Sequence, residues 1–145
     1  MPWTRLLRSN QVTAEASSKQ ELDNLRSIVQ LRLSDINATG LSDEQQFIIA
    51  YDAARTLSMM IVLAAGYRPR KVGAHYNTFI ALEGADAAFS RLSSYFNTCR
   101  MKRNDSEYDF AGSITKTEAE ELIKIVQQFA SDAQEWIAKN YPTLV

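Results

Sequence analysis

The chain has 145 residues, of which 46% are hydrophobic and 23% are charged, and its formal net charge is −1. A chain of this size and composition has room for one compact core and gives no reason to expect two domains. Its single cysteine excludes an internal disulfide, and one cysteine with one histidine cannot form a structural zinc site. We therefore expect one domain with no metal and no cofactor. The lone cysteine favours a reducing, cytoplasmic location, and the longest apolar stretch, residues 57–65, is too short to span a bilayer.

Residues 1–16 are the one segment that we expect to be partly disordered, as an N-terminal arm. The first predicted helix follows it. Ser18 and Glu21, three residues apart, form a capping box that opens this helix, and Gly40 lies near its end. Its apolar face consists of Leu22, Leu25, Val29 and Leu33.

A second capping box, Ser42 with Gln45, opens a longer helix that ends at Gly66, a residue type common just after the last helical turn. Apolar residues occupy almost every side of this helix, so we expect it to be central and the most buried. Asp52 and Arg55 stand three residues apart on it, a spacing that favours an ion pair over a functional site.

Three further helices complete the chain. A short one covers about residues 72–83 and stops at Gly84, the next starts at Asp86, and the last begins at the capping box of Thr115 and Glu118 and closes at Pro142. No segment alternates convincingly with the period of a strand. We therefore expect residues 17–145 to form a single all-α domain, an antiparallel up-and-down bundle of four to five helices.

The charges are distributed unevenly along the chain. Residues 68–103 carry seven basic and two acidic side chains, whereas residues 104–145 carry three basic and eight acidic ones. Such asymmetry marks either an anion-binding surface or two helices that pair with each other, within the bundle or across a dimer.

The helix that starts at Asp86 places a charge on its own apolar face. Arg103 continues, at helical spacing, the core stripe Phe89, Leu92, Phe96 and Cys99, and a charge in that position needs a partner. Arg100, Asn104 and Tyr108 fall on the same side, and Lys102 adds a further cation. Together these side chains offer a bidentate clamp, an amide and a phenol for a phosphate. The alternative is an ion pair of Arg103 with Asp52, Asp105, Glu107 or a C-terminal acid.

The sequence contains no glycine-rich phosphate loop and no pair of histidines on a helix. His75 is the obvious acid or base because its ordinary pKa is near neutrality, although a histidine at an apolar register also suits a packed core. Cys99 lies within the apolar stripe and is expected to be inert packing. The loop residues Arg68, Arg70 and Lys71 either meet phosphate or are simply solvated.

The order of these features resembles the HEPN domains, small helical bundles found in prokaryotic toxin–antitoxin and defence systems. The resemblance covers about residue 18 to the C-terminus. It rests on residues 51–55 leading to the segment 63–70, then His75, then residues 102–104 with 107–109, and then the long capped last helix.

The resemblance implies a homodimer in which the basic segments face each other and form a shared cleft for an anionic ligand. In active members, which look like metal-independent ribonucleases, an arginine and a polar residue are followed after a few spacers by a histidine. Arg103 and Asn104 match the start of this pattern, but Glu107, Tyr108 and Asp109 stand where the histidine is expected. Since that histidine would assist proton transfer at the 2′-hydroxyl, its absence favours binding without nuclease activity.

Three hypotheses follow. In the first, the chain is an HEPN-like module that binds a nucleotide, RNA or a partner protein, such as a small nucleotidyltransferase, through a basic cleft at a homodimer interface. In the second, it is a divergent metal-independent endoribonuclease toxin with Arg103, Tyr108 and His75 as candidate catalytic residues. In the third, it is a structural bundle with no ligand.

Overall fold

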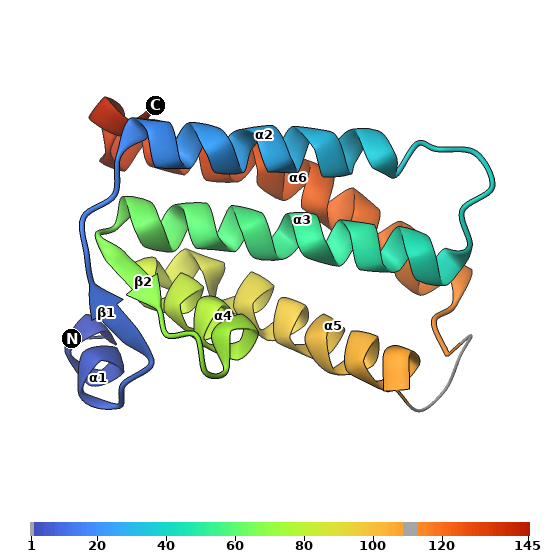
Figure 1. Cartoon of the computed structure of the whole chain (residues 1–145), viewed down its shortest axis with the longest axis horizontal. Helices are drawn as coiled ribbons and strands as arrows, with labels where there is room; N and C mark the ends of the chain where they lie inside the picture. Colours follow the sequence, from blue (N-terminus) through green and yellow to red (C-terminus); the bar gives the residue numbers. More distant parts are fainter. Residues whose placement is uncertain (1, 109–112) are drawn as a thin grey trace.

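The computed structural model describes the backbone of residues 2–108 and 113–145, and the side chains of residues 2–104 and 113–145. In this part of the chain the fold is all-α apart from one small antiparallel sheet, as the sequence predicts (Figure 1). The elements are α1 (Pro2–Arg8), β1 (Val12–Ala14), α2 (Lys19–Asp35), α3 (Asp43–Ala64), β2 (Tyr67–Pro69), α4 (Ala74–Ala85), the 3-10 helix η1 (Ala87–Phe89), α5 (Ser90–Tyr108), α6 (Lys116–Asn140) and the 3-10 helix η2 (Pro142–Leu144).

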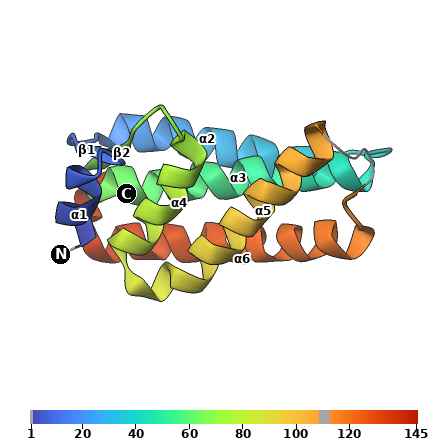
Figure 2. The same cartoon turned by 90° about the horizontal axis from the view of Figure 1, so that it is seen from below.

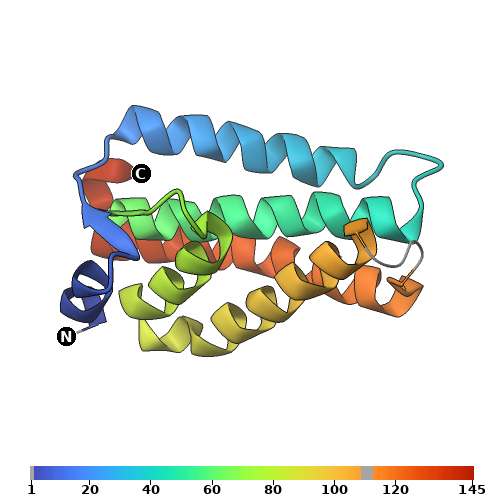
Figure 3. The same cartoon turned by 60° about the horizontal axis from the view of Figure 1, so that its bottom comes forward.

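The long helices α2, α3, α5 and α6 form an antiparallel bundle in which α5 crosses the others at an angle (Figure 3). The helix α3 lies at the centre and contacts α2, α4, α5 and α6. Seen from the side of α4 and α5, these two helices cover α3 and α6 (Figure 2). The predicted central position of residues 43–64 is therefore confirmed.

Burial of α3 on every side forms the core of the bundle. Its fully buried residues include Tyr51, Ala54, Leu57 and Ile61. The length and apolar composition of α3 would also suit a membrane-spanning helix. The core helices of soluble proteins meet the same two criteria. Here 72% of the qualifying apolar window is buried inside the fold, and other helices of the same chain cover it.

Two of the three predicted capping boxes are present. The Ser42 hydroxyl accepts a hydrogen bond from the backbone N–H of Gln45, whose side chain accepts one from the N–H of Ser42, and Thr115 and Glu118 repeat this exchange on α6. Ser18 also caps α2, but the Glu21 carboxylate is bound to other groups instead of the backbone. Each cap satisfies a backbone donor that the first helical turn would otherwise leave unpaired.

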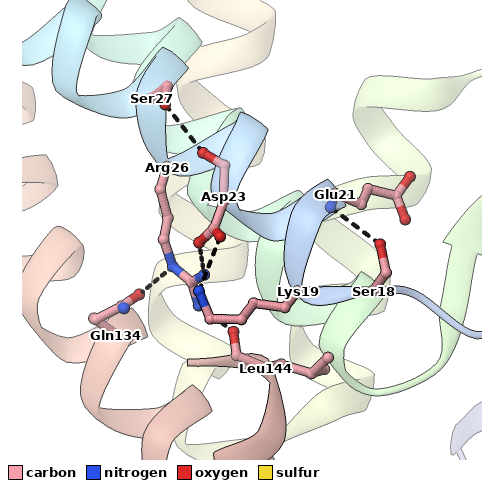
Figure 4. A network of polar contacts seen from close by, with 8 residues as sticks. All are labelled: Ser18, Lys19, Glu21, Asp23, Arg26, Ser27, Gln134 and Leu144. Carbon is pink, nitrogen blue, oxygen red and sulfur yellow. Dashed lines mark hydrogen bonds and ion pairs between the residues drawn. The ribbon is translucent and has the colours of Figure 1, made fainter.

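Arg26 attaches α2 to the C-terminal end of the chain (Figure 4). Its Nε donates to Gln134 of α6 at 3.1 Å, and an Nη donates to the carbonyl oxygen of Leu144 at 2.6 Å. The other Nη forms an ion pair with Asp23 at 2.6 Å. These contacts connect the first and last helices of the bundle, which are far apart in the sequence.

The expectation of a partly disordered N-terminal arm is wrong, because residues 2–14 fold against the bundle. α1 buries Leu6, which is 1% exposed, and β1 buries Val12 and pairs with β2, which follows α3. Trp3 stacks on Tyr67 with the ring centroids 4.0 Å apart. Three residues are too few for the alternation of a strand to be visible in the sequence, and the pairing partner lies more than fifty residues away.

The sequence predicts that α4 stops at Gly84, but the helix includes this glycine and continues to Ala85. A Cβ at this position would lie 3.0 Å from Cδ1 of Leu6. The glycine therefore serves close packing: the absence of a side chain lets α1 approach the C-terminal turn of α4.

We expect Leu6→Ala to lower the free energy of unfolding by about 2–4 kcal/mol, because the substitution leaves a cavity beneath α1. Leu7→Ala is the matched control: Leu7 is 38% exposed, so the change should be about 0.5 kcal/mol or less. Urea unfolding followed by circular dichroism measures both. Equal stabilities for the two variants would show that the arm does not pack as described.

Candidate functional site

Three arginines gather around Tyr51, and we call Arg55, Arg100 and Arg103 the arginine cluster. Arg55 follows Tyr51 on α3 by one turn, whereas Arg100 and Arg103 come from the C-terminal half of α5. The Cζ of Arg103 lies 5.5 Å from the centroid of the Tyr51 ring, within the range of a cation–π contact. Burial raises the pKa of Tyr51 to about 12, although the charges of Arg103, Arg55 and Arg100 oppose the shift. Tyr51 is therefore a neutral phenol near pH 7.

His75 joins this group through Tyr51. It is the second residue of α4, and its Nδ1 lies 2.9 Å from the Tyr51 hydroxyl oxygen. Burial, followed by the charges of Arg55 and Arg103, lowers the pKa of His75 below its ordinary value. The imidazole is then neutral at pH 7, and its tautomer decides whether Nδ1 accepts a hydrogen bond from the Tyr51 hydroxyl or donates one to it.

Asp52 and Arg55 form the predicted ion pair, with Oδ1 of Asp52 3.6 Å from an Nη of Arg55. The other carboxylate oxygen of Asp52 accepts a hydrogen bond from Nε of Arg32 at 2.9 Å. Asp52, one of the partners considered for Arg103, is thus engaged by two other arginines. Among the described residues, the buried Nε of Arg55 has no hydrogen-bond partner, so it keeps donor capacity beside His75.

Tyr76 extends the site toward solvent. The Cζ of Arg100 lies 5.5 Å from the centroid of the Tyr76 ring, and Nε of Arg100 donates to Oδ1 of Asn97 at 2.9 Å. The Tyr76 side chain is 41% exposed. One guanidinium of the cluster therefore contacts an aromatic ring that is open to solvent.

The structure brings together some of the predicted site residues and separates others. Arg100, Arg103 and His75 meet around Tyr51. Lys102 points to the other side of α5, where its Nζ lies 3.2 Å from Glu118 of α6. Asn104 is half-buried at the end of the described side chains, and the side chain of Tyr108 lies outside the described residues.

The apolar stripe that leads to Arg103 is present as predicted. Phe89, Phe96 and Cys99 are buried, and Leu92 packs against the core. Burial raises the pKa of the Cys99 thiol to about 12, so the thiol stays protonated near neutral pH, as expected of a packing residue.

The basic loop after α3 is partly neutralised. Arg68 forms ion pairs with Glu15 at 2.9 Å and with Glu21 at 2.8 Å. A hollow of about 720 Å³ lies over this loop, and its lining among the described residues includes Arg70 and Lys71 but no member of the arginine cluster. Arg68 is thus a structural bridge between the N-terminal arm, α2 and β2.

Sequence reasoning missed the roles of Tyr51, Arg55 and Tyr76. Tyr51 and Arg55 lie on the helix expected to be central and the most buried, and Arg55 was assigned to an ion pair with Asp52. The available signal was the spacing of Tyr51 and Arg55, four residues apart and therefore on one side of that helix. Only the packing of α4 and α5 on α3 shows which other residues face them.

Within the described residues, no group of three or more histidine, cysteine, aspartate or glutamate side chains could hold a metal ion. The chain matches none of the protein-family models, curated proteins or solved structures with which it was compared. The resemblance to HEPN domains accordingly stays a prediction.

We expect the pKa of His75 to lie below about 6.5, the ordinary value for histidine. Arg103→Gln should raise it, because one of the cations that disfavour the imidazolium is removed. Arg91→Gln, which removes an exposed charge elsewhere on α5, is the matched control and should leave it unchanged. His75 is the only histidine of the chain, so an NMR titration of the imidazole signals needs no assignment.

The same shift makes stability depend on pH. Because the folded pKa is the lower one, the unfolded chain binds more protons as the pH falls through about 6.5, and folding loses stability toward the folded pKa. Above that window His75 contributes no pH dependence. A measured pKa of His75 at or above the ordinary value would contradict the described surroundings.

Proposed function

We propose that the chain is an HEPN-like module that binds the phosphate of a nucleotide or of RNA at the arginine cluster, without cleaving it. The observation that carries this proposal is the convergence of Arg55, Arg100 and Arg103, from two different helices, around the neutral pair Tyr51 and His75. Neighbouring guanidinium groups repel one another, and a bound anion would offset this repulsion. The gathering of the three arginines therefore favours an anionic ligand.

The chemistry of the surrounding groups suits a phosphate. Guanidinium groups donate two parallel hydrogen bonds to phosphate oxygens. His75 lies in the first turn of α4, where the helix dipole adds a partial positive charge. His75 is half-buried and uncharged near pH 7, so it adds hydrogen-bonding capacity without repelling the ligand, and the buried Tyr51 orients it through the contact at 2.9 Å.

A second copy of the chain is part of the proposal, because the resemblance implies a cleft shared between two basic segments. Met101 follows Arg100 on α5 and is 47% exposed, so a contact between the C-terminal halves of two α5 helices would cover it. A partner protein, such as a small nucleotidyltransferase, is the alternative occupant of this face.

We expect Arg103→Gln to weaken the binding of a labelled single-stranded RNA oligomer by about tenfold or more, since a charge-assisted contact is worth about 1.5–3 kcal/mol. Arg91→Gln is the matched control, with the same change in net charge, and should bind as the wild type does. Fluorescence anisotropy at several salt concentrations measures affinity, which should fall as salt rises.

The outcomes separate the binding module from the structural bundle. Binding that does not depend on salt or on Arg103 would remove the phosphate site. If the chain binds neither RNA nor a nucleotide, and captures no protein in a pulldown, only the hypothesis of a structural bundle without a ligand remains. Light scattering of the same samples tests the second copy: a monomeric mass, both free and with RNA, would remove the dimer but not the phosphate site.

Ribonuclease activity is the second candidate function, and the position of His75 favours it. The fold supplies, from α4, an imidazole within hydrogen-bond distance of the hydroxyl of Tyr51, the residue whose ring Arg103 contacts. In the tautomer whose Nδ1–H donates to the Tyr51 hydroxyl oxygen, Nε2 of His75 would take the proton of a 2′-hydroxyl. The resulting oxygen attacks the adjacent phosphorus and expels the 5′-oxygen, which takes a proton from water. Arg103 would bind the phosphate during this transfer.

We expect RNA to remain intact when it is incubated with the wild-type protein and EDTA, because binding without cleavage is the function proposed. Cleavage that His75→Gln reduces by about a hundredfold or more would instead establish the ribonuclease. Arg91→Gln, assayed in parallel, controls for contaminating nucleases and for general loss of charge. Gel electrophoresis of labelled RNA provides the measurement.

A further inference from the structure

Tyr76 is an exposed aromatic residue that borders the arginine cluster. It follows His75 directly on α4, and 41% of its surface is accessible. Its ring contacts Arg100, whose Cζ lies 5.5 Å from the ring centroid, and part of the ring remains open to solvent.

Arg100 connects the ring with the rest of the cluster. Its guanidinium lies beside Tyr76, and its charge also acts on Tyr51 and His75. The hydrogen bond from its Nε to Asn97 holds the guanidinium in place. Arg103 follows one turn later on α5, about 5 Å along the helix axis. The exposed ring and the cationic groups thus adjoin each other.

The exposed ring adds apolar surface beside a cation of the cluster, because Tyr76 is 41% exposed and lies against Arg100. A ligand that has only charge would leave this ring unused.

We propose that Tyr76 is a stacking platform for an unpaired nucleobase, so that the ligand of this face is single-stranded RNA or a free nucleotide. This inference rests on the proposed function, in which the arginine cluster holds a phosphate. Aromatic rings stack on any base, since every base has a π face, and neighbouring guanidinium groups add cation–π attraction. A base in a duplex is already stacked and paired, so duplex RNA gains nothing from Tyr76.

Phosphopeptides are the competing ligand class. They also offer a phosphate to the arginines, but they carry no base to cover the exposed ring. The exposed Tyr76 ring favours the nucleotide. A phosphopeptide that binds more tightly than RNA would be an outcome against the inference.

The experiment compares Tyr76→Leu with Tyr76→Phe in the full chain. Loss of stacking should weaken the binding of a labelled single-stranded RNA oligomer by about tenfold, whereas phenylalanine keeps the ring and should change it by less than about twofold. An oligomer with an abasic position at every site should bind the wild type as weakly as the normal oligomer binds Tyr76→Leu. The Leu substitution should then have no further effect on the abasic oligomer.

The salt dependence distinguishes this inference from the proposed function. Tyr76→Leu should keep the salt slope of the wild type, because the phosphate contacts remain, whereas Arg103→Gln should reduce it. Equal affinities of Tyr76→Leu and the wild type, or of the normal, abasic and duplex oligomers, would overturn the stacking site and leave phosphate binding intact. An affinity for RNA that changes neither with salt concentration nor on Arg103→Gln would overturn the phosphate site itself. Circular dichroism of each variant verifies folding, which an exposed side chain should not disturb.

Discussion

The burial of α3 on all sides is the constraint on which the rest of the structure depends. A helix of 22 residues that is apolar almost all round must be covered by other helices, and α2, α4, α5 and α6 each cover part of it. The cost of exposing any part of this surface is large, at about 25 cal/mol for each Å² of apolar area. The positions of the shorter elements, including the short helix α4, therefore follow from the need to complete this cover.

The candidate site forms where the apolar cover meets the polar positions of α3. Tyr51 buries its ring in the core but places its hydroxyl against His75, and Asp52 and Arg55 face outward between the neighbouring helices. Arg103 ends the apolar stripe of α5 over the same ring. Burial, together with the positive charge at this border, lowers the pKa of His75, so the site combines fixed cations with hydrogen-bonding groups that carry no charge near pH 7.

Local signals in the sequence predicted most of the bundle, and long-range contacts account for what they missed. The caps at Ser42 and Thr115 and the stripe leading to Arg103 depend on residues three or four apart, which a single segment reveals. The folding of residues 2–14 depends on contacts with β2 and with Gly84, both far along the chain, so the same reasoning predicted disorder. His75 and Arg103 were each predicted as candidate site residues. Their contacts with Tyr51, however, depend on how α3, α4 and α5 pack together, which no single segment reveals.

The N-terminal arm matters for the site because it holds α4 at both ends. At the C-terminal end α1 packs on Gly84, where a Cβ would lie only 3.0 Å from Cδ1 of Leu6. At the N-terminal end β1 pairs with β2, and the backbone N–H of Arg70 donates to the carbonyl oxygen of Gln11, so the loop that leads into His75 is attached to the arm. Asn77 fixes the same loop from inside α4 by donating to the carbonyl oxygens of Arg70 and Val72. A helix of twelve residues gains little stability of its own in water, so these attachments, together with the burial of Phe79 and Leu82, set the direction in which the first turn of α4 presents His75 and Tyr76.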